Sequence, residues 1–570
     1  MPGVSPARTQ LVTPLRVAAV VALATQTVVL WVLRVPLGLQ AAVLATATLA
    51  VLCGAALLRP VLAMVDDGPA RSALAFLGGM VAITAASDVL FHEPVREALG
   101  LHSAAAGVRL ALAVVVLGSL LAWRGKGLGA RRGPPDRSWH GVLALVLALG
   151  MSAATIFGVA NSVHIGGHQV RKILAELPPD HPLVGSTLPD WGVAGDYLVH
   201  LIKLTAAIEP GGLPDKPEEI AHRGLQVWVL STSLAFDEFD TSDPMQAAKV
   251  LAVPTWFSLL ALGWFVARRV LGVGSRASIA AMGAVALFGV INVPLFQVSD
   301  SSYAGFFNAA TTLFHNAPQL YCVTLGMAAL ALIGLAVQGD LLVGGPFLTG
   351  AGFATASFWY KPAAFFVLGP AIGLAALPWL RRAPRIVLGV GAILAAPVAV
   401  WFVYPKIVDG HHYSLVPVLD PFSFVQAAAL QFPSWVASSG WLLAGAVVTA
   451  SWAAWAAPLA SWAARTWRLC QERGCRAGRA LRASPAQTVV IAALLIGFVV
   501  AALLTEEGRP TPGNMRWPSA AAYVLALPLL IRLVTDIRSR IGRMIAWVVV
   551  GLHIWSGGLH LYLIVSLRHL

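Results

Sequence analysis

Residues 317–337 read APQLYCVTLGMAALALIGLAV, an apolar run with no Asp, Glu, Lys or Arg. A helix needs roughly 20 such residues to cross a bilayer, so this run predicts a transmembrane helix. Similar runs recur along the 570 residues, of which 58% are hydrophobic and only 11% charged. Soluble proteins carry about 25% charged residues, and their cores stop growing near about 300 residues. The composition therefore excludes a large soluble protein and predicts an all-α polytopic membrane protein.

We expect about 15 transmembrane helices from the length of the apolar runs. Four form an N-terminal block in residues 1–123, near 17–37, 41–63, 73–91 and 105–123. The rest form a core in residues 141–570, near 141–161, 250–267, 277–298, 317–337, 341–357, 362–380, 386–404, 440–463, 487–504, 518–534 and 544–566. The basic, Gly- and Pro-rich segment 124–140 is predicted to link the two blocks.

The positive charges indicate how the chain is oriented. The net charge is +13, and the Lys and Arg residues cluster in alternate short connections, as the positive-inside rule requires of cytoplasmic loops. We therefore interpret the excess as a topology signal and expect no nucleic-acid partner. The prediction is a multi-pass protein of the plasma (inner) membrane with a cytoplasmic N-terminus. Its external loops are then 162–249, 299–316, 405–439 and 505–517.

The first external loop carries the strongest candidates for chemistry. Asp196 and His200 are four residues apart, which on a helix places a carboxylate and an imidazole on one face. A general base needs such a group within hydrogen-bond reach of a hydroxyl. Alternatively, Asp196 caps a short helix over 197–207 at the membrane surface. Asp190 lies shortly before it in the same loop.

A second acidic cluster has two interpretations. Asp237, Glu238, Asp240 and Asp243 lie close together, and clustered carboxylates can hold a divalent cation. We prefer the alternative that Asp243 and Pro244 begin the helix of the next span. We expect no metal site and no required cofactor, although a divalent cation is compatible with this cluster.

Later external loops contribute further polar residues. Lys361 stands between two apolar runs in FWYKP, residues 358–362, where it would either snorkel to the interface or hold a phosphate. His553 and His560 on the last span are more typical of helix–helix hydrogen bonding. The other candidates of these loops are Asp300, His315, His411, His412, Glu506, Arg509, Asn514 and Arg516.

The order of these features from 141 to about 535 resembles the GT-C superfamily of membrane glycosyltransferases, which use polyprenyl-phosphate-linked sugars. The matching pieces are Asp196 and His200 with GGLP at 211–214, DPMQAAK at 243–249, HNAPQLY at 315–321, YKP at 360–362, and EEGR and GNMRW within 506–517. Two features depart from the family pattern. Four spans precede the core, and Asp196 lies well beyond the end of its span at 161.

The resemblance implies roles for these residues. Asp196, or Asp190 in its place, would be the catalytic base. Lys361 and Arg516, with Arg509, would bind the donor phosphate. The residues that would contact the substrates are His200, Asp300, His315, His411, His412, Glu506 and Asn514.

The implied reaction is transfer of a sugar to a glycan, lipid or protein hydroxyl on the external face. Two other classes compete with it. A transporter or flippase usually has two similar halves and charges at mid-membrane, whereas here the acids gather in the predicted external loops. A ligase or acyltransferase acting on lipid-borne substrates is the third class, and the residues separate it poorly from a glycosyltransferase.

Asp196→Asn is expected to abolish sugar transfer without affecting expression or membrane insertion, because the amide cannot accept the acceptor's proton. Transfer of radiolabelled sugar from polyprenyl phosphate in isolated membranes measures this. Transfer at the wild-type rate would show that Asp196 is not the base.

Overall fold

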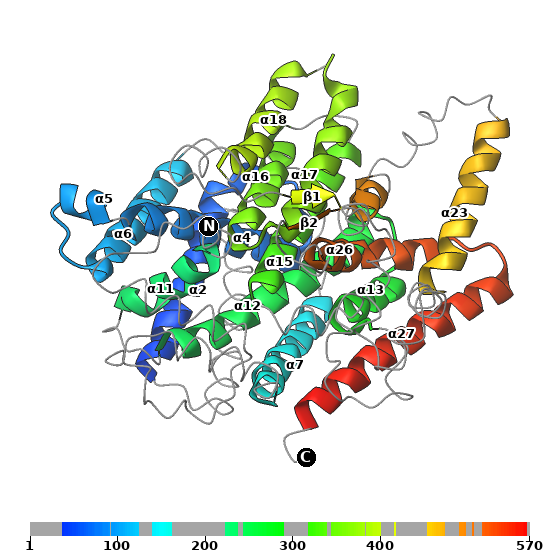
Figure 1. Cartoon of the computed structure of the whole chain (residues 1–570), viewed down its shortest axis with the longest axis horizontal. Coiled ribbons are helices and arrows are strands. Elements are labelled where there is room, and N and C mark those ends of the chain that lie inside the picture. The colour runs from blue at the N-terminus through cyan, green and yellow to red at the C-terminus, as the bar shows by residue number, and fades with distance from the viewer. Residues whose placement is uncertain are drawn as a thin grey trace, which may run out of the picture. The chain divides into compact units, whose positions relative to one another are not determined.

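The computed structural model describes residues 37–91, 93–124, 139–161, 223–236, 243–289, 317–338, 344–381, 383–400, 415–417, 453–472, 489–496, 504–506 and 516–566. These parts are almost entirely helical (Figure 1), as predicted. Among them, six helices are long and apolar enough to cross a membrane: Gly38–Leu57, Gly68–Phe91, Ala104–Trp123, Val250–Val270, Pro318–Gln338 and Arg540–Leu559. The protein is thus a helical membrane protein with several spans, whereas the predicted total of about 15 is not confirmed.

The chain divides into two compact units, Met1–Leu262 and Gly263–Leu570. The boundaries that we expect at 123 and 141 stay a prediction. Elements of the first unit are α2 (Leu37–Leu57), α3 (Arg59–Leu62), α4 (Gly68–Phe91), α5 (Glu93–Ala98), α6 (Ala104–Arg124), α7 (Trp139–Asn161), α11 (Arg223–Phe236) and most of α12 (Asp243–Phe265).

Helices α2 and α4 pack with their backbones in close contact. A Cβ added at Gly79 would lie 1.8 Å from the carbonyl oxygen of Ala50, and one at Gly54 would lie 1.8 Å from that of Ala75. Small residues at such a crossing are typical of helix association in membranes, where close van der Waals contact replaces the hydrophobic effect. These contacts also show that α2 and α4 are antiparallel.

One end of the first unit is held by polar contacts. The His140 Nε2 atom at the start of α7 is 2.8 Å from Asp67 Oδ2, and Asp67 Oδ1 accepts a 2.8 Å hydrogen bond from the Ala70 amide at the start of α4. Arg59 donates from Nη1 to the Trp123 carbonyl oxygen at 3.0 Å. The predicted topology places all these residues on one side of the membrane, and the contacts agree with that grouping.

Helix α11 belongs to the predicted external loop 162–249, where we expected short helices at the membrane surface. A surface helix exposes one face, but every residue of α11 from Arg223 to Ala235 is buried. The hydroxyl groups of Ser231, Thr232 and Ser233 donate to the carbonyl oxygens four residues earlier, so they need no outside partner. Helix α11 is therefore an internal helix of the first unit.

The second unit contains most of the remaining helices. Its elements are η1 (Val266–Val270), α13 (Ser275–Leu287), α15 (Ala317–Gln338), α16 (Gly344–Tyr360), α17 (Pro362–Ala376), η4 (Leu377–Trp379), α18 (Pro384–Val398), β1 (Leu415–Pro417), α23 (Ala453–Glu472), β2 (Leu504–Glu506), α26 (Arg516–Thr535) and α27 (Arg540–Ser566). The two short strands β1 and β2 pair antiparallel.

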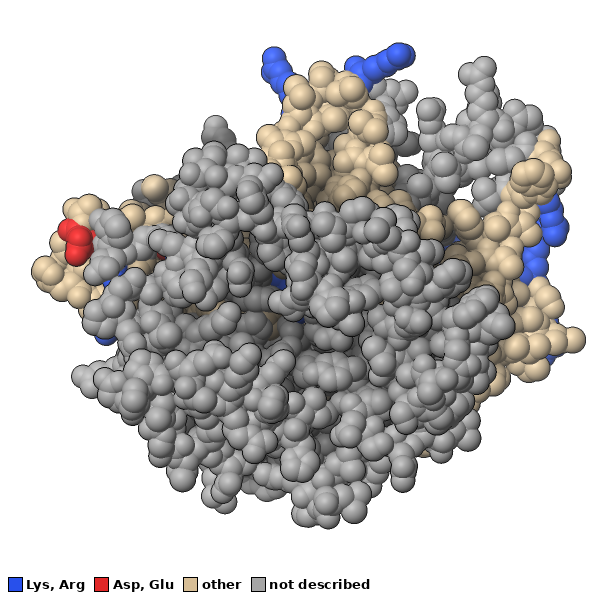
Figure 2. Space-filling model, in the orientation of Figure 1, with Lys and Arg blue, Asp and Glu red and all other residues tan. Residues whose placement is uncertain are grey.

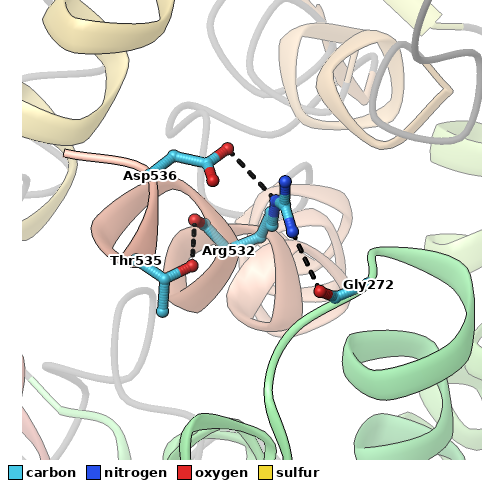
Figure 3. Close-up of polar contacts among 4 residues, drawn as sticks. All are labelled: Gly272, Arg532, Thr535 and Asp536. Carbon is cyan, nitrogen blue, oxygen red and sulfur yellow. Dashed lines mark hydrogen bonds and ion pairs between the residues drawn. The ribbon is translucent and has the colours of Figure 1, made fainter. Parts of the chain in front are cut away.

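Hydrogen bonds connect the C-terminal ends of α15 and α26 to the end of η1 and the turn that follows it. Arg532 of α26 donates from Nη1 to the Gly272 carbonyl oxygen at 2.9 Å and from Nε to Asp536 at 3.1 Å (Figure 3). Gln338 at the end of α15 donates to the Val270 carbonyl oxygen. Gly272 has φ +68°, a conformation that glycine adopts without strain. Because the C-terminal ends of α15 and α26 meet here, the two helices run in the same direction.

Helix α13 ends at Leu287, before the predicted end of its span at 298. Phe288 is extended, and the Gly289 amide donates to the His553 carbonyl oxygen at 3.0 Å. His553 Nδ1 is 2.6 Å from the Gly289 carbonyl oxygen, so His553 bonds to the backbone just beyond α13 and not to a second helix. At Gly557 a Cβ would lie 1.7 Å from the Leu287 carbonyl oxygen. The end of α13 is therefore set by contact with α27.

Gly79→Ala is expected to lower the free energy of unfolding by about 1–3 kcal/mol, because its methyl group meets the backbone of α2. Gly118→Ala on α6 is the control, since a Cβ there has no atom within 4 Å. Thermal unfolding in detergent measures both variants. Equal effects of the two would contradict the close α2–α4 contact.

Candidate functional site

Lys361 is the predicted site residue whose side chain and backbone the structure both describe. It forms a single-residue break between α16 and α17, with φ −169° and ψ 133°. A residue before proline is pushed out of the helical region, and Pro362 suits the first position of a helix because it lacks an amide hydrogen. The Lys361 amide donates to the Ser357 carbonyl oxygen at 2.9 Å. The Lys-Pro pair thus ends one helix and begins the next.

The Lys361 side chain lies inside the bundle. The residue is only 6% exposed, which does not fit a lysine that snorkels to water. Tyr321 of α15 stacks on Tyr360, the residue before Lys361, with ring centroids 5.6 Å apart and an interplanar angle of 4°. The Cys322 thiol of α15 donates to the Gln319 carbonyl oxygen at 3.3 Å and lies within electrostatic range of the Lys361 ammonium group. The first turns of α15 and α17 therefore meet at Lys361.

Helix α16 is antiparallel to α15, and α17 returns parallel to it. Tyr360 pairs with Tyr321 near one end, while a Cβ at Gly350 would contact Ile333 toward the other end. After the break, Ala364 and Leu368 of α17 lie beside Gly326 of α15. Helices α16 and α17 are thus a hairpin with Lys361 at its tip, as the closely spaced predicted runs 341–357 and 362–380 suggested.

The N-terminal end of α26 lies at the level of this tip. A Cβ added at Gly326 of α15 would also lie 3.3 Å from the Leu525 side chain of α26. Gly326 and Leu525 each lie nine residues after the first residue of their helix, Ala317 and Arg516. Because α15 and α26 run in the same direction, their first turns lie at the same end as Lys361. The backbone of Arg516, the first residue of α26, therefore lies at that end.

This end of the second unit is suited to bind an anion. The N-termini of α15, α17 and α26 each carry a partial positive charge from the helix dipole, and the Lys361 ammonium group adds a full one. Backbone N–H groups of the first turns also point outward along the helix axes. Cations and helix N-termini together are a recurrent arrangement for phosphate groups.

The strand pair joins two of the predicted external loops. Leu415 pairs with Glu506, and Val416 pairs with Thr505. The backbone of Glu506 therefore lies beside that of Leu415. Sequence patterns missed this pairing because runs of three residues carry too little alternation to indicate a strand.

The other predicted site residues lie outside the described parts of the chain, and their roles stay predictions. They are Asp190, Asp196, His200, Asp300, His315, His411, His412, Arg509 and Asn514.

In the acidic cluster, α12 begins at Asp243 with Pro244 next, as the helix-start interpretation predicts. Within the described ranges there is no group of three or more side chains suited to bind a metal.

The sequence interpretation overlooked a buried ion pair in the first unit. Asp88 of α4 pairs with Nε of Arg223 of α11, and the two side chains are 10% and 7% exposed. A lone aspartate within an apolar span is itself a signal, because ionisable residues in membranes are rare and usually paired. Its partner could not be found from the pattern, since the two residues are 135 positions apart.

No family model, curated protein or solved structure matches this chain. The GT-C resemblance stays an expectation from the order of the motifs.

Polyprenyl phosphate is expected to stabilise the purified protein thermally, by about 2.7 kcal/mol when present at 100 times its Kd. Lys361→Gln should remove most of this stabilisation, because the amide carries no charge. Arg381→Gln is the control, since Arg381 is an exposed cation beyond the opposite end of α17. An equal shift in all three proteins would exclude Lys361 from the anion site.

Proposed function

We propose that this chain is an integral membrane glycosyltransferase that moves a sugar from a polyprenyl-phosphate donor to an acceptor hydroxyl. The observation that carries the proposal is the burial of Lys361 at the shared N-terminal end of α15, α17 and α26. The order of motifs that resembles GT-C enzymes supports the same conclusion. The acceptor would be a glycan, a lipid or a protein.

The surroundings of Lys361 favour an anion that carries an apolar chain. Phe358, two residues before Tyr360, contacts Phe365 edge-on at 5.4 Å and Phe366 at 6.1 Å. Phe358 and Phe365 are each 4% exposed. A lipid phosphate is compatible with this position, because it places its charge at a membrane boundary and keeps its prenyl chain in the apolar phase of the bilayer.

The proposed reaction is a single displacement. The acceptor oxygen attacks the anomeric carbon while the bond from that carbon to the phosphate oxygen breaks, and the electron pair stays on the phosphate. Lys361 and the helix N-termini stabilise the charge that grows there. Asp196 accepts the proton of the acceptor hydroxyl, and Arg516 assists at the phosphate. The leaving phosphate needs no general acid, and the reaction needs no metal.

The charge distribution supports an external site. Arg268, Arg269 and Arg532 lie at the end of the helices opposite Lys361. Figure 2 shows further Lys and Arg side chains at the tip between α17 and α18, where Arg381 and Arg385 are exposed. By the positive-inside rule these ends face the cytoplasm. The Lys361 end then faces the outside of the plasma membrane.

Sugar transfer in proteoliposomes tests the proposal. Lys361→Gln is expected to lower kcat/KM for the donor about 10- to 100-fold, the range for a hydrogen bond to a charged group. Lys361→Arg should retain more activity than Lys361→Gln, and Arg381→Gln should match the wild type. Movement of intact donor between leaflets without a new glycosidic bond would instead identify a flippase.

A further inference from the structure

The turn between α26 and α27 carries a cluster of exposed arginines. Arg538, Arg540 and Arg543 lie within six residues, and all three side chains are exposed. Within the part of the chain that the structure describes, no hydrogen bond or ion pair engages their guanidinium groups. Asp536 is the only acid in the sequence from 516 to 566, and it is bonded to Arg532 at 3.1 Å. The positive charge of the turn is therefore not balanced by these neighbours.

The fold of this turn does not depend on the guanidinium groups. Ser539 caps α27, because its Oγ accepts from the Gly542 amide at 3.2 Å and its carbonyl oxygen accepts from the Arg543 amide at 2.8 Å. At the end of α26, the Asp536 amide donates to the Arg532 carbonyl oxygen at 3.1 Å. Backbone and serine bonds thus hold the turn, and the arginine side chains are available to a ligand.

A further exposed arginine lies at the same end of the second unit. Arg276, near the start of α13, is four residues after Gly272. The Gly272 carbonyl oxygen accepts from Arg532 at the end of α26 (Figure 3), and α27 begins shortly after that end. The starts of α13 and α27 therefore both lie beside the Gly272 turn. In the orientation predicted from the positive-inside rule, this is the cytoplasmic boundary of the membrane.

An exposed apolar face of α27 continues from the arginines into the membrane. Ile541, Met544, Ile545 and Val548 are 68%, 61%, 55% and 57% exposed, and they recur at the spacing of one helix face. Arg540 lies one turn before Met544 on that side. Because α27 contains a span apolar and long enough to cross a bilayer, this face is suited to contact acyl chains.

We propose that the α26–α27 turn binds the phosphate of an anionic phospholipid whose acyl chains lie along the exposed face of α27. Arginine pairs with phosphate through two parallel N–H groups, and basic residues at a membrane surface select anionic lipids. A soluble phosphate would use the arginines but leave the apolar face without a role, so the lipid fits both features. The inference does not depend on the proposed sugar transfer, since Lys361 lies at the opposite end of these helices.

Thermal stabilisation of the purified full chain tests the proposal, with phosphatidylglycerol, phosphatidylcholine and inorganic phosphate as probes. Phosphatidylglycerol is expected to raise the Tm of the wild type at concentrations where the other two do not. One arginine near an anionic surface changes affinity about five-fold. Arg540→Gln combined with Arg543→Gln should therefore raise the half-saturating concentration of phosphatidylglycerol about 25-fold. Replacing both by Lys should restore most of the affinity, because the charges remain.

Arg109→Gln is the matched control. Arg109 is exposed near the start of α6, a helix that is also capped by a serine, since the Ala106 amide donates to Ser103 Oγ at 3.1 Å. The preceding helix α5 contains the exposed Glu97, so positive charge is not concentrated there. This variant should keep the wild-type response to phosphatidylglycerol. Lys361→Gln should keep it too, which separates this surface from the proposed donor site.

Three results would overturn the proposal. The first is equal stabilisation of the wild type by phosphatidylglycerol and phosphatidylcholine, or an equal loss of response in Arg109→Gln. The second is stabilisation by inorganic phosphate at the same concentrations as by phosphatidylglycerol, which would show an anion site that needs no lipid. The third is a lower Tm of the double Gln variant before any lipid is added, which would show that the two arginines hold the fold.

Discussion

The α16–α17 hairpin places Lys361 at the N-terminal ends of α15, α17 and α26, and the proposed donor site depends on this placement. Lys361 lies at the tip of the hairpin, beside the positive N-terminal ends of α15, α17 and α26 and the negative C-terminal end of α16 at Tyr360. The three N-termini and the ammonium group are the features on which the proposed anion site rests. In the proposed function this anion is the phosphate of a lipid-linked donor.

At the opposite end of the same helices, the polar groups that the structure describes around the Gly272 turn bond within the protein. There the backbone presents carbonyl oxygens at Val270 and Gly272, and the side chains of Gln338 and Arg532 donate to them. The turn is thus a closed joint in which these acceptors are satisfied within the protein. The helices are therefore joined by hydrogen bonds at the Gly272 end. The Lys361 end is the one that we propose binds the donor.

Composition and local pattern predicted the helical membrane class and several boundaries. The predicted spans 341–357 and 362–380 left a break around Lys361, Asp243-Pro244 predicted a helix start, and the structure contains both. These features depend on backbone preferences of neighbouring residues, which a sequence displays directly. The grouping of basic residues likewise agrees with the contact of Arg532 with the Gly272 turn.

Features that depend on distant contacts could not be predicted. The apolar pattern continues past Leu287, yet α13 ends there because the backbone of Gly289 bonds to His553 of α27. Helix α11 has serines and threonines that suggest a surface, yet its contacts with α2, α4 and α6 bury it. In each case the deciding partner lies far along the chain, where local residue patterns give no signal.

Photocrosslinking with a polyprenyl phosphate that carries a diazirine next to its phosphate tests the central claim most directly. The account predicts labelled peptides that contain residues 317–323 and 358–364, with labelling reduced by unmodified polyprenyl phosphate. Labelling confined to peptides around Gly272 and Arg532, or spread evenly over lipid-facing helices, would contradict it.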